Sequence, residues 1–194
     1  NTNDLGEDNA LSAEQIEWLK ADMGASKKPW KFIALHKAIY SNGSHYDDGE
    51  IITMREQLGK LMPELGIDLV LQGHDHVYMR THSLDSNEVV SESKVNLKHN
   101  GEVYEAYVNP TGTSYAINGC SGVKIYNVKD VSLTDELFPR AAKAVDVDNQ
   151  IFSSIQIDGG VLYFNAYTVD GDKVNCIDKF AIEKDGSGEK TDEP

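Results

Sequence analysis

The chain has 194 residues, of which 40% are hydrophobic and 26% are charged, and its formal net charge is −14 at pH 7. This composition is ordinary for one globular domain. The acidic excess, with no basic patch or stripe, argues against binding to a nucleic-acid backbone or to an anionic membrane surface. No apolar run is long enough to cross a bilayer, so no membrane insertion is expected.

The first predicted element is a helix that begins after Ser12 and ends near Gly24. Ser12 and Gln15 have the spacing of a capping box, in which the serine side chain accepts from the Gln15 amide and the glutamine side chain reaches back. Apolar residues then recur on one face, and Gly24 offers a stop. We expect this helix to pack on a sheet.

The run 30–36 has the pattern of a strand and ends on His36. The segment 37–50 that follows is polar, with turn-forming residues throughout, and is expected to be a loop able to meet a substrate. Its acidic residues lack the spacing of a calcium-binding loop and are expected to cap the next helix: Asp47, Asp48 and Glu50.

A second helix is predicted over 50–65, because apolar residues repeat there at helical spacing. Pro63 is expected to kink or fray its last turn, and Gly66 is expected to close it. The strand 67–71 comes next, so strand, helix and strand form one βαβ unit.

Both strands of this unit are followed by histidine. His74 and His76 come directly after Gly73, and side chains at i and i+2 leave the same side of an extended segment, so they can converge on one ion or on two adjacent ions. Parallel strands deliver functional residues at their carboxyl ends, which would bring His36 to the same edge. Neutral imidazole suits zinc, iron and manganese, so this edge is a candidate metal site.

Each of these histidines also has a simpler interpretation. His74 and His76 could be loop histidines without a ligand, and His36 could be packed under the edge of the sheet. The spacing by itself does not decide between these interpretations.

After residue 81 the pattern changes to short β-rich runs separated by turn signals. Asp158-Gly159 and Asp170-Gly171 mark the clearest hairpins. The polar segment 85–101 is interpreted as a variable insertion. The predicted strands cover residues 103–108, 114–117, 123–126, 151–157, 161–167 and 174–182.

Two cysteines, Cys120 and Cys176, are far apart in the sequence. They could pair in an oxidising compartment, or both could be small buried hydrophobic residues. We favour the unpaired state.

Two blocks of the sequence together resemble the calcineurin-like metallophosphoesterases, and within them the purple acid phosphatase branch. They are Leu-His-Lys-Ala-Ile-Tyr-Ser at 35–41 and Gly-His-Asp-His-Val-Tyr-Met-Arg-Thr at 73–81. The resemblance implies that His36 and His74 share one metal ion and that His76 binds its neighbour. It implies two divalent or trivalent ions, from iron, zinc or manganese, without deciding which.

The resemblance also implies a fold, an α/β four-layer αββα sandwich, of which residues 1–184 correspond to the C-terminal half: a βαβ unit followed by a β-rich meander. Residues 185–194 are expected to be a flexible tail or linker. The Asp-x-His, Gly-Asp-x-x-Asp and Gly-Asn-His-Glu blocks of the family are absent, so the missing N-terminal half of the domain is the expected partner.

The activity that the resemblance implies is hydrolysis of a small phosphate ester, of the acid phosphatase or phosphodiesterase type, by metal-bound hydroxide. His45 matches the family histidine that contacts the substrate phosphate or protonates the leaving group, although it could equally be an exposed loop histidine. The alternative is a non-catalytic metal-binding or ligand-binding module or a structural fragment. Similar enzymes are often secreted or displayed on the cell surface, and this is the localisation that we expect.

Overall fold

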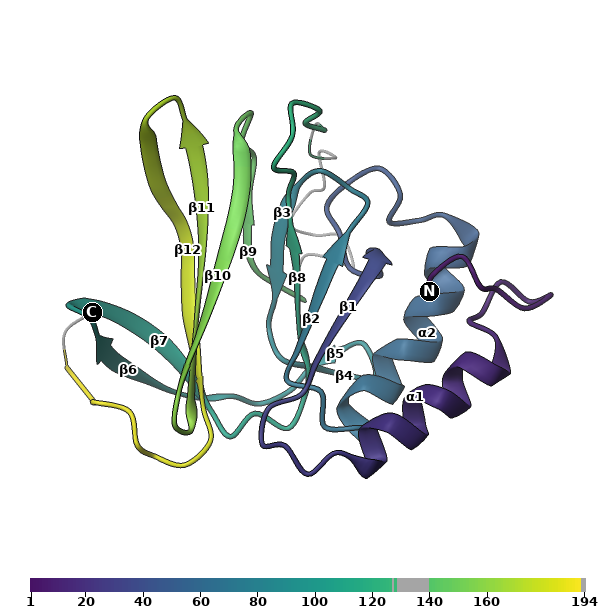
Figure 1. Ribbon diagram of the computed structural model, residues 1–194, viewed down its shortest axis with the longest axis horizontal. Helices are drawn as coiled ribbons and strands as arrows, with labels where there is room; N and C mark the ends of the chain where they lie inside the picture. Colours follow the sequence, from purple (N-terminus) through teal and green to yellow (C-terminus); the bar gives the residue numbers. More distant parts are fainter. Residues whose placement is uncertain (127, 129–139, 193–194) are drawn as a thin grey trace.

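The computed structural model describes residues 1–126, 128 and 140–192. Two five-stranded sheets face each other in this part of the chain, and two helices cover the outer face of the first sheet (Figure 1). A separate two-stranded ribbon, β4 (Leu84–Asp85) with β5 (Glu88–Val89), lies near the end of the second helix.

The first sheet has the order β1-β2-β8-β3-β9. Its first three strands are parallel to one another, and β3 runs antiparallel to both of its neighbours. The bounds are β1 (Phe32–Lys37), β2 (Leu69–Gly73), β8 (Ser114–Asn118), β3 (Tyr78–Thr81) and β9 (Ala141–Val145).

The second sheet has the order β10-β11-β12-β7-β6 and is antiparallel except where β12 meets β7. The hairpins expected at Gly159 and Gly171 are confirmed, and both glycines have positive φ, at 56° and 57°. The bounds are β10 (Gln150–Asp158), β11 (Val161–Asp170), β12 (Lys173–Glu183), β7 (Glu102–Val108) and β6 (Ser93–His99).

Both predicted helices are present, as α1 (Ala13–Ala25) and α2 (Gly49–Glu64). The Ser12 side chain caps α1 by accepting from the amide of Gln15 at 3.3 Å. The other half of the expected capping box is wrong, because the Gln15 side chain bonds to Asn1 instead. Gly24 does not end α1, whose C-cap is Ser26. Gly66, with φ of 67°, closes the turn after α2 as expected.

Three expectations for the second half of the chain are wrong. The segment 85–101 is not an irregular insertion, because β6 lies within it and pairs with β7, where Leu97 is fully buried. The run 123–126 is not a strand. The run 114–117 forms a strand as predicted, β8, but it lies in the first sheet between β2 and β3 and so is not part of the expected meander.

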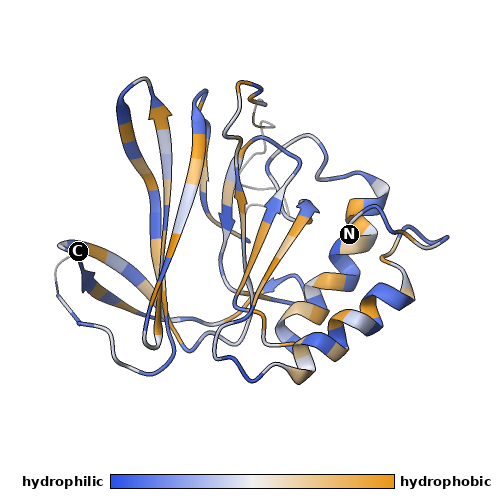
Figure 2. Cartoon of the chain, in the orientation of Figure 1, coloured by the Kyte–Doolittle hydropathy of each residue, from blue (hydrophilic) through white to orange (hydrophobic). Residues whose placement is uncertain are grey.

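Three hydrophobic clusters hold the described elements together, and apolar stripes appear on the helices and strands in Figure 2. One cluster is formed by residues of the second sheet, among them Leu97 and Tyr163. The two others lie against the first sheet. One lies between the helices and the first sheet and includes Met54, Leu58 and Tyr115. The other lies between the two sheets and includes Leu162 and Phe164.

The C-terminal segment, the two cysteines and the helices were also subjects of expectation. Beyond β12, the amide of Thr191 donates to Asn96 and the amide of Lys98 donates to Glu189, so part of the segment 185–194 runs beside β6. Cys120 and Cys176 are both free thiols. None of the helices in the described ranges has the length and apolarity needed to cross a membrane.

A buried ion pair joins the two sheets. Arg80 on β3 donates from Nε and Nη2 to the two carboxylate oxygens of Asp178 on β12, at 2.7 and 3.1 Å. Tyr78 also donates to Asp178, at 2.8 Å, and Arg80 donates to the hydroxyl of Tyr107. Burial alone would lower the pKa of Arg80, but the hydrogen bonds and charge of Asp178 raise it. The guanidinium therefore stays charged inside the protein.

Replacing Asp178 with asparagine should destabilise the fold strongly, because it leaves the charge of Arg80 buried without a counter-ion. We expect a loss of about 3 kcal/mol in the free energy of unfolding. Urea titration measures this loss, and Glu102→Gln is the matched control, since Glu102 pairs with the exposed Lys179 on the same strand as Asp178. Equal unfolding midpoints for the two variants would contradict the assignment.

Candidate metal centre

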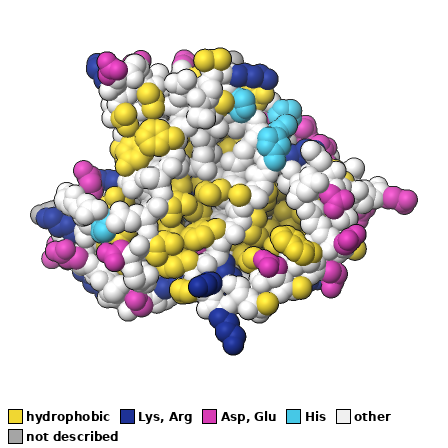
Figure 3. Space-filling view, in the orientation of Figure 1, with side chains coloured by type: hydrophobic (Ala, Val, Ile, Leu, Met, Phe, Trp, Pro, Cys, Tyr) yellow, Lys and Arg dark blue, Asp and Glu magenta, His cyan; other side chains and the backbone are white. Residues whose placement is uncertain are grey.

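The carboxyl ends of β1 and β2 lie side by side, because these parallel strands pair in register from Phe32 opposite Leu69 to Lys37 opposite Gly73. The register shifts at His36, near the end of β1, and His74 follows the end of β2 directly. Figure 3 shows histidine side chains gathered at the upper right of the molecule, at this edge of the first sheet.

His36 and His74 meet at this edge. His36 Nε2 lies 3.1 Å from His74 Nδ1, and the two rings pack edge to face with centroids 5.0 Å apart. His74 has φ of 72°, a conformation that a residue with a side chain rarely adopts. Gly73 permits the close approach, because a Cβ there would lie 3.3 Å from the carbonyl oxygen of His36.

The surroundings of His74 favour its neutral form. Burial lowers the pKa of His74, and the neighbouring His45 and His36 lower it further. A neutral imidazole has a free lone pair, which is the form that binds a metal ion.

His45 lies beside the pair. Its ring centroid is 4.6 Å from that of His74. Its Nδ1 donates to Asp48 Oδ2 at 2.8 Å, and its Nε2 lies 4.0 Å from Asp75 Oδ1. Asp48 is at the N-cap of α2 as expected, but its side chain makes no capping hydrogen bond and holds His45 instead.

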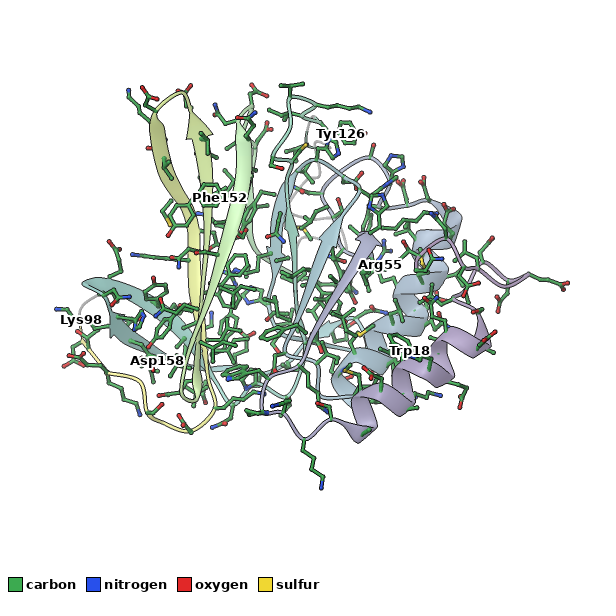
Figure 4. The ribbon with its side chains drawn as sticks, viewed as in Figure 1. Trp18, Arg55, Lys98, Tyr126, Phe152 and Asp158 are labelled. Carbon is green, nitrogen blue, oxygen red and sulfur yellow. The ribbon has the colours of Figure 1, made fainter. Side chains whose placement is uncertain are left out.

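His76 has different neighbours. Its ring stacks on Tyr126, with centroids 4.4 Å apart and planes 9° from parallel, and its Nδ1 donates to the carbonyl of Lys124. Figure 4 shows Tyr126 in the chain segment above the first sheet. Donation from Nδ1 fixes the tautomer and leaves Nε2 of His76 as a free acceptor.

The separation of the two paired nitrogens fits one metal ion. Metal–nitrogen bonds of about 2.0–2.1 Å at tetrahedral or octahedral angles place two ligand nitrogens about 2.9–3.4 Å apart. His36 and His74, at 3.1 Å, are within this range. No group of three or more potential ligands from histidine, cysteine, aspartate and glutamate occurs within the described ranges. His36 and His74 could therefore supply two donors to a metal ion, and the ligand roles expected from the sequence stay predictions.

Sequence reasoning missed the residues that support this edge. The side chain of Gln72 accepts from the amides of Ile39 and Tyr40 and donates to the carbonyl of Tyr40, at 2.8, 3.1 and 2.9 Å. Arg55 of α2, labelled in Figure 4, donates to the carbonyls of Ile39 and Tyr46. The loop after His36 is thus braced from two sides. A glutamine inside an otherwise apolar strand was the one available sequence signal.

Comparison with known proteins gives the class of this region. Residues 1–78 match the family model of calcineurin-like phosphoesterases. This region is therefore similar to calcineurin-like phosphoesterases, and the resemblance inferred from the two histidine blocks is confirmed.

Several of the relatives that the chain is similar to are acid phosphatases or purple acid phosphatases. An acid phosphatase from Aspergillus ficuum is 31% identical over 57% of this chain and 17% of its own length. A protein named probable inactive purple acid phosphatase 1, from Arabidopsis thaliana, is 28% identical over 88% of this chain and 26% of its own length.

A solved purple acid phosphatase from yellow lupin (Lupinus luteus) seeds matches with a TM-score of 0.67 at 21% identity. The match covers 90% of this chain and 29% of the lupin chain, and it confirms the metallophosphoesterase fold class. The chain spans less than a third of the length of each of these proteins.

Replacing Gln72 with leucine should loosen the loop after His36, because buried backbone groups of Ile39 and Tyr40 would lose their partners. We expect a loss of about 2 kcal/mol in the free energy of unfolding, together with faster amide exchange at Ile39 and Tyr40. Gln57→Leu is the control, since Gln57 braces the backbone of Leu11 in the same way but is only half-buried. Unchanged exchange at Ile39 in Gln72→Leu would refute the bracing role.

Proposed function

We propose that this chain is part of a metal-dependent phosphoric ester hydrolase of the acid phosphatase or phosphodiesterase type, acting on a small phosphate ester. The observation that carries the proposal is the 3.1 Å separation of His36 Nε2 and His74 Nδ1 at the carboxyl edge of a parallel strand pair. The sequence match of residues 1–78 and the acid phosphatase relatives support the same class.

In this proposal His36 and His74 hold one ion and His76 holds a second through Nε2. Iron, zinc and manganese all suit imidazole ligands. When bound, two such cations lower the pKa of water and neutralise the charge that builds on the phosphoryl oxygens. Neutral His74 and the fixed tautomer of His76 prepare both side chains for this role.

His45 is proposed to contact the substrate and to protonate the leaving group. A water oxygen forms the new bond to phosphorus and releases a proton to solvent, while the bond from phosphorus to the leaving oxygen breaks and that oxygen takes a proton from His45. Asp48 accepts from Nδ1 of His45, so Nε2 is the nitrogen left to donate the proton; it lies 4.0 Å from Asp75 Oδ1, in a ring beside that of His74.

The proposed partner is a polypeptide that carries the absent Asp-x-His, Gly-Asp-x-x-Asp and Gly-Asn-His-Glu blocks. β1 is the outer strand of the first sheet, so one of its edges has no strand beside it among the described residues. Ile155 and Ile157 lie on the inner face of β10, and Gln156 between them lies on the outer face. The two isoleucines nevertheless remain 37% and 45% exposed. Figure 3 shows hydrophobic side chains in the hollow between the sheets. An apolar strand docked beside β1 would cover them.

The alternative function is a non-catalytic metal-binding or ligand-binding module or a structural fragment. It is supported by the relative named probable inactive, which is similar over 88% of this chain. Secretion or display on the cell surface is a further part of the proposal and rests on the family resemblance alone.

The first test is metal binding and turnover. His36→Ala and His74→Ala should each weaken zinc binding by the 194-residue chain by at least about tenfold, since even losing a residue that only orients a ligand costs that much. In the protein that also carries the upstream blocks, these variants and His76→Ala should abolish hydrolysis of 4-nitrophenyl phosphate. His99→Ala is the control, because His99 stacks on Tyr163 away from this edge. Near wild-type turnover in His74→Ala and His76→Ala would reject the proposal.

The second test concerns docking. Ile157→Lys should weaken association of the chain with a separately produced upstream polypeptide, because it places a charge on the face that the partner would cover. Ile52→Lys, at a comparably exposed isoleucine on α2, should leave association unchanged. Titration calorimetry measures both, and equal affinities for the two variants would contradict the docking face.

A further inference from the structure

Asp75, between the two histidines of the turn after β2, is a carboxylate that the mechanism above does not use. Its side chain is only 1% exposed. Oδ2 accepts from the hydroxyl of Ser41 at 2.6 Å, and Oδ1 is buried with no hydrogen-bond partner among the described residues. Burying a carboxyl group with one oxygen not hydrogen-bonded costs free energy of folding, so we expect Asp75 to have a role that offsets this cost.

The loop that carries His45 is folded tightly against this carboxylate. Ser41 Oγ donates to Asp75 and accepts from the amide of Gly43 at 2.8 Å. A Cβ at position 43 would lie 2.5 Å from Cγ of Asp75 and 2.6 Å from its Oδ2. Only glycine fits there, so the backbone at residues 41–43 lies directly on the carboxylate.

This contact lies close to His45. His45 comes two residues after Gly43, and its Nε2 is 4.0 Å from the unpartnered Oδ1 of Asp75. The carboxyl group of Asp75 therefore faces Nε2 of the ring, while Asp48 holds Nδ1 at 2.8 Å. The same turn that carries His74 thus also contacts the loop that carries His45.

We propose that Asp75 is a positioning residue that holds the 41–45 loop, and through it the His45 ring, at a fixed place beside His74. The inference rests on the proposed function in one respect, since it gives the position of His45 a purpose in leaving-group protonation. The competing interpretation is that Asp75 only stabilises the turn between β2 and β3.

The structural part of the test uses the 194-residue chain without any substrate. Asp75→Ala and Ser41→Ala should each speed amide exchange at Gly43 and remove the nuclear Overhauser effect between the rings of His45 and His74. Ser44→Ala, at an exposed serine of the same loop, should change neither. Unchanged exchange and an unchanged ring contact in both Asp75→Ala and Ser41→Ala would overturn the proposal. Two variants are used so that a folding failure of one leaves the other decisive.

The kinetic part uses the protein with its upstream blocks. Asp75→Asn keeps an acceptor for Ser41 but removes the charge that faces His45. For phenyl phosphate, whose phenoxide leaving group needs a proton, the variant should lower kcat by a large factor. This factor should be at least about ten times the factor for 4-nitrophenyl phosphate, with KM little changed for both. A uniform fall for both esters would show that Asp75 only stabilises the turn, and would overturn the proposal. If the wild-type protein binds no zinc and hydrolyses neither ester, the proposed function is rejected. The amide-exchange result would still decide whether Asp75 positions the loop.

Discussion

The bidentate ion pair between Arg80 and Asp178 is the contact on which the geometry of the histidine edge depends. Arg80 lies four residues beyond His76, on the strand that leaves the turn, and Asp178 belongs to the opposite sheet. β2, on the other side of the turn, is paired with β1 and with β8. The turn 74–77 is thus fixed at both ends. A positive φ at His74 costs free energy and persists only where the surrounding structure imposes it, as here.

The loop after His36 is also held in place by other elements, here through polar contacts. Its residues 38–43 are buried, although the sequence predicts a polar loop there that could meet a substrate. Gln72 from β2, Arg55 from α2 and Asp75 from the turn satisfy its backbone and side-chain groups. Because each bracing residue comes from a different element, the position of His45 depends on the correct packing of α2 on the first sheet. The site is therefore a product of the whole α/β layer.

The sequence correctly predicted those elements that have a strong local pattern. α2, β2 and the two glycine hairpins have clear periodicity or turn chemistry, and the rule that parallel strands end at one edge brought His36 and His74 together. β6 was missed because it is an edge strand, whose solvent-facing residues make it read as polar while Leu97 alone is fully buried. The roles of Gln72 and Asp75 could not be predicted, because their hydrogen-bond partners are more than thirty residues away in the sequence.

Among the described residues, β1 is the outer strand of the first sheet, and the proposed partner would dock beside it. Two imidazoles bring no negative charge, and a dication or trication held near phosphate is ordinarily also bound by carboxylates. A further parallel strand beside β1 would end at the same edge as His36, because parallel strands deliver their carboxyl ends together. Carboxylates on that strand would then lie within reach of the His36 and His74 nitrogens. In the proposed function, a strand docked beside β1 would cover the exposed isoleucines of β10 and bring carboxylates to the same edge as His36 and His74.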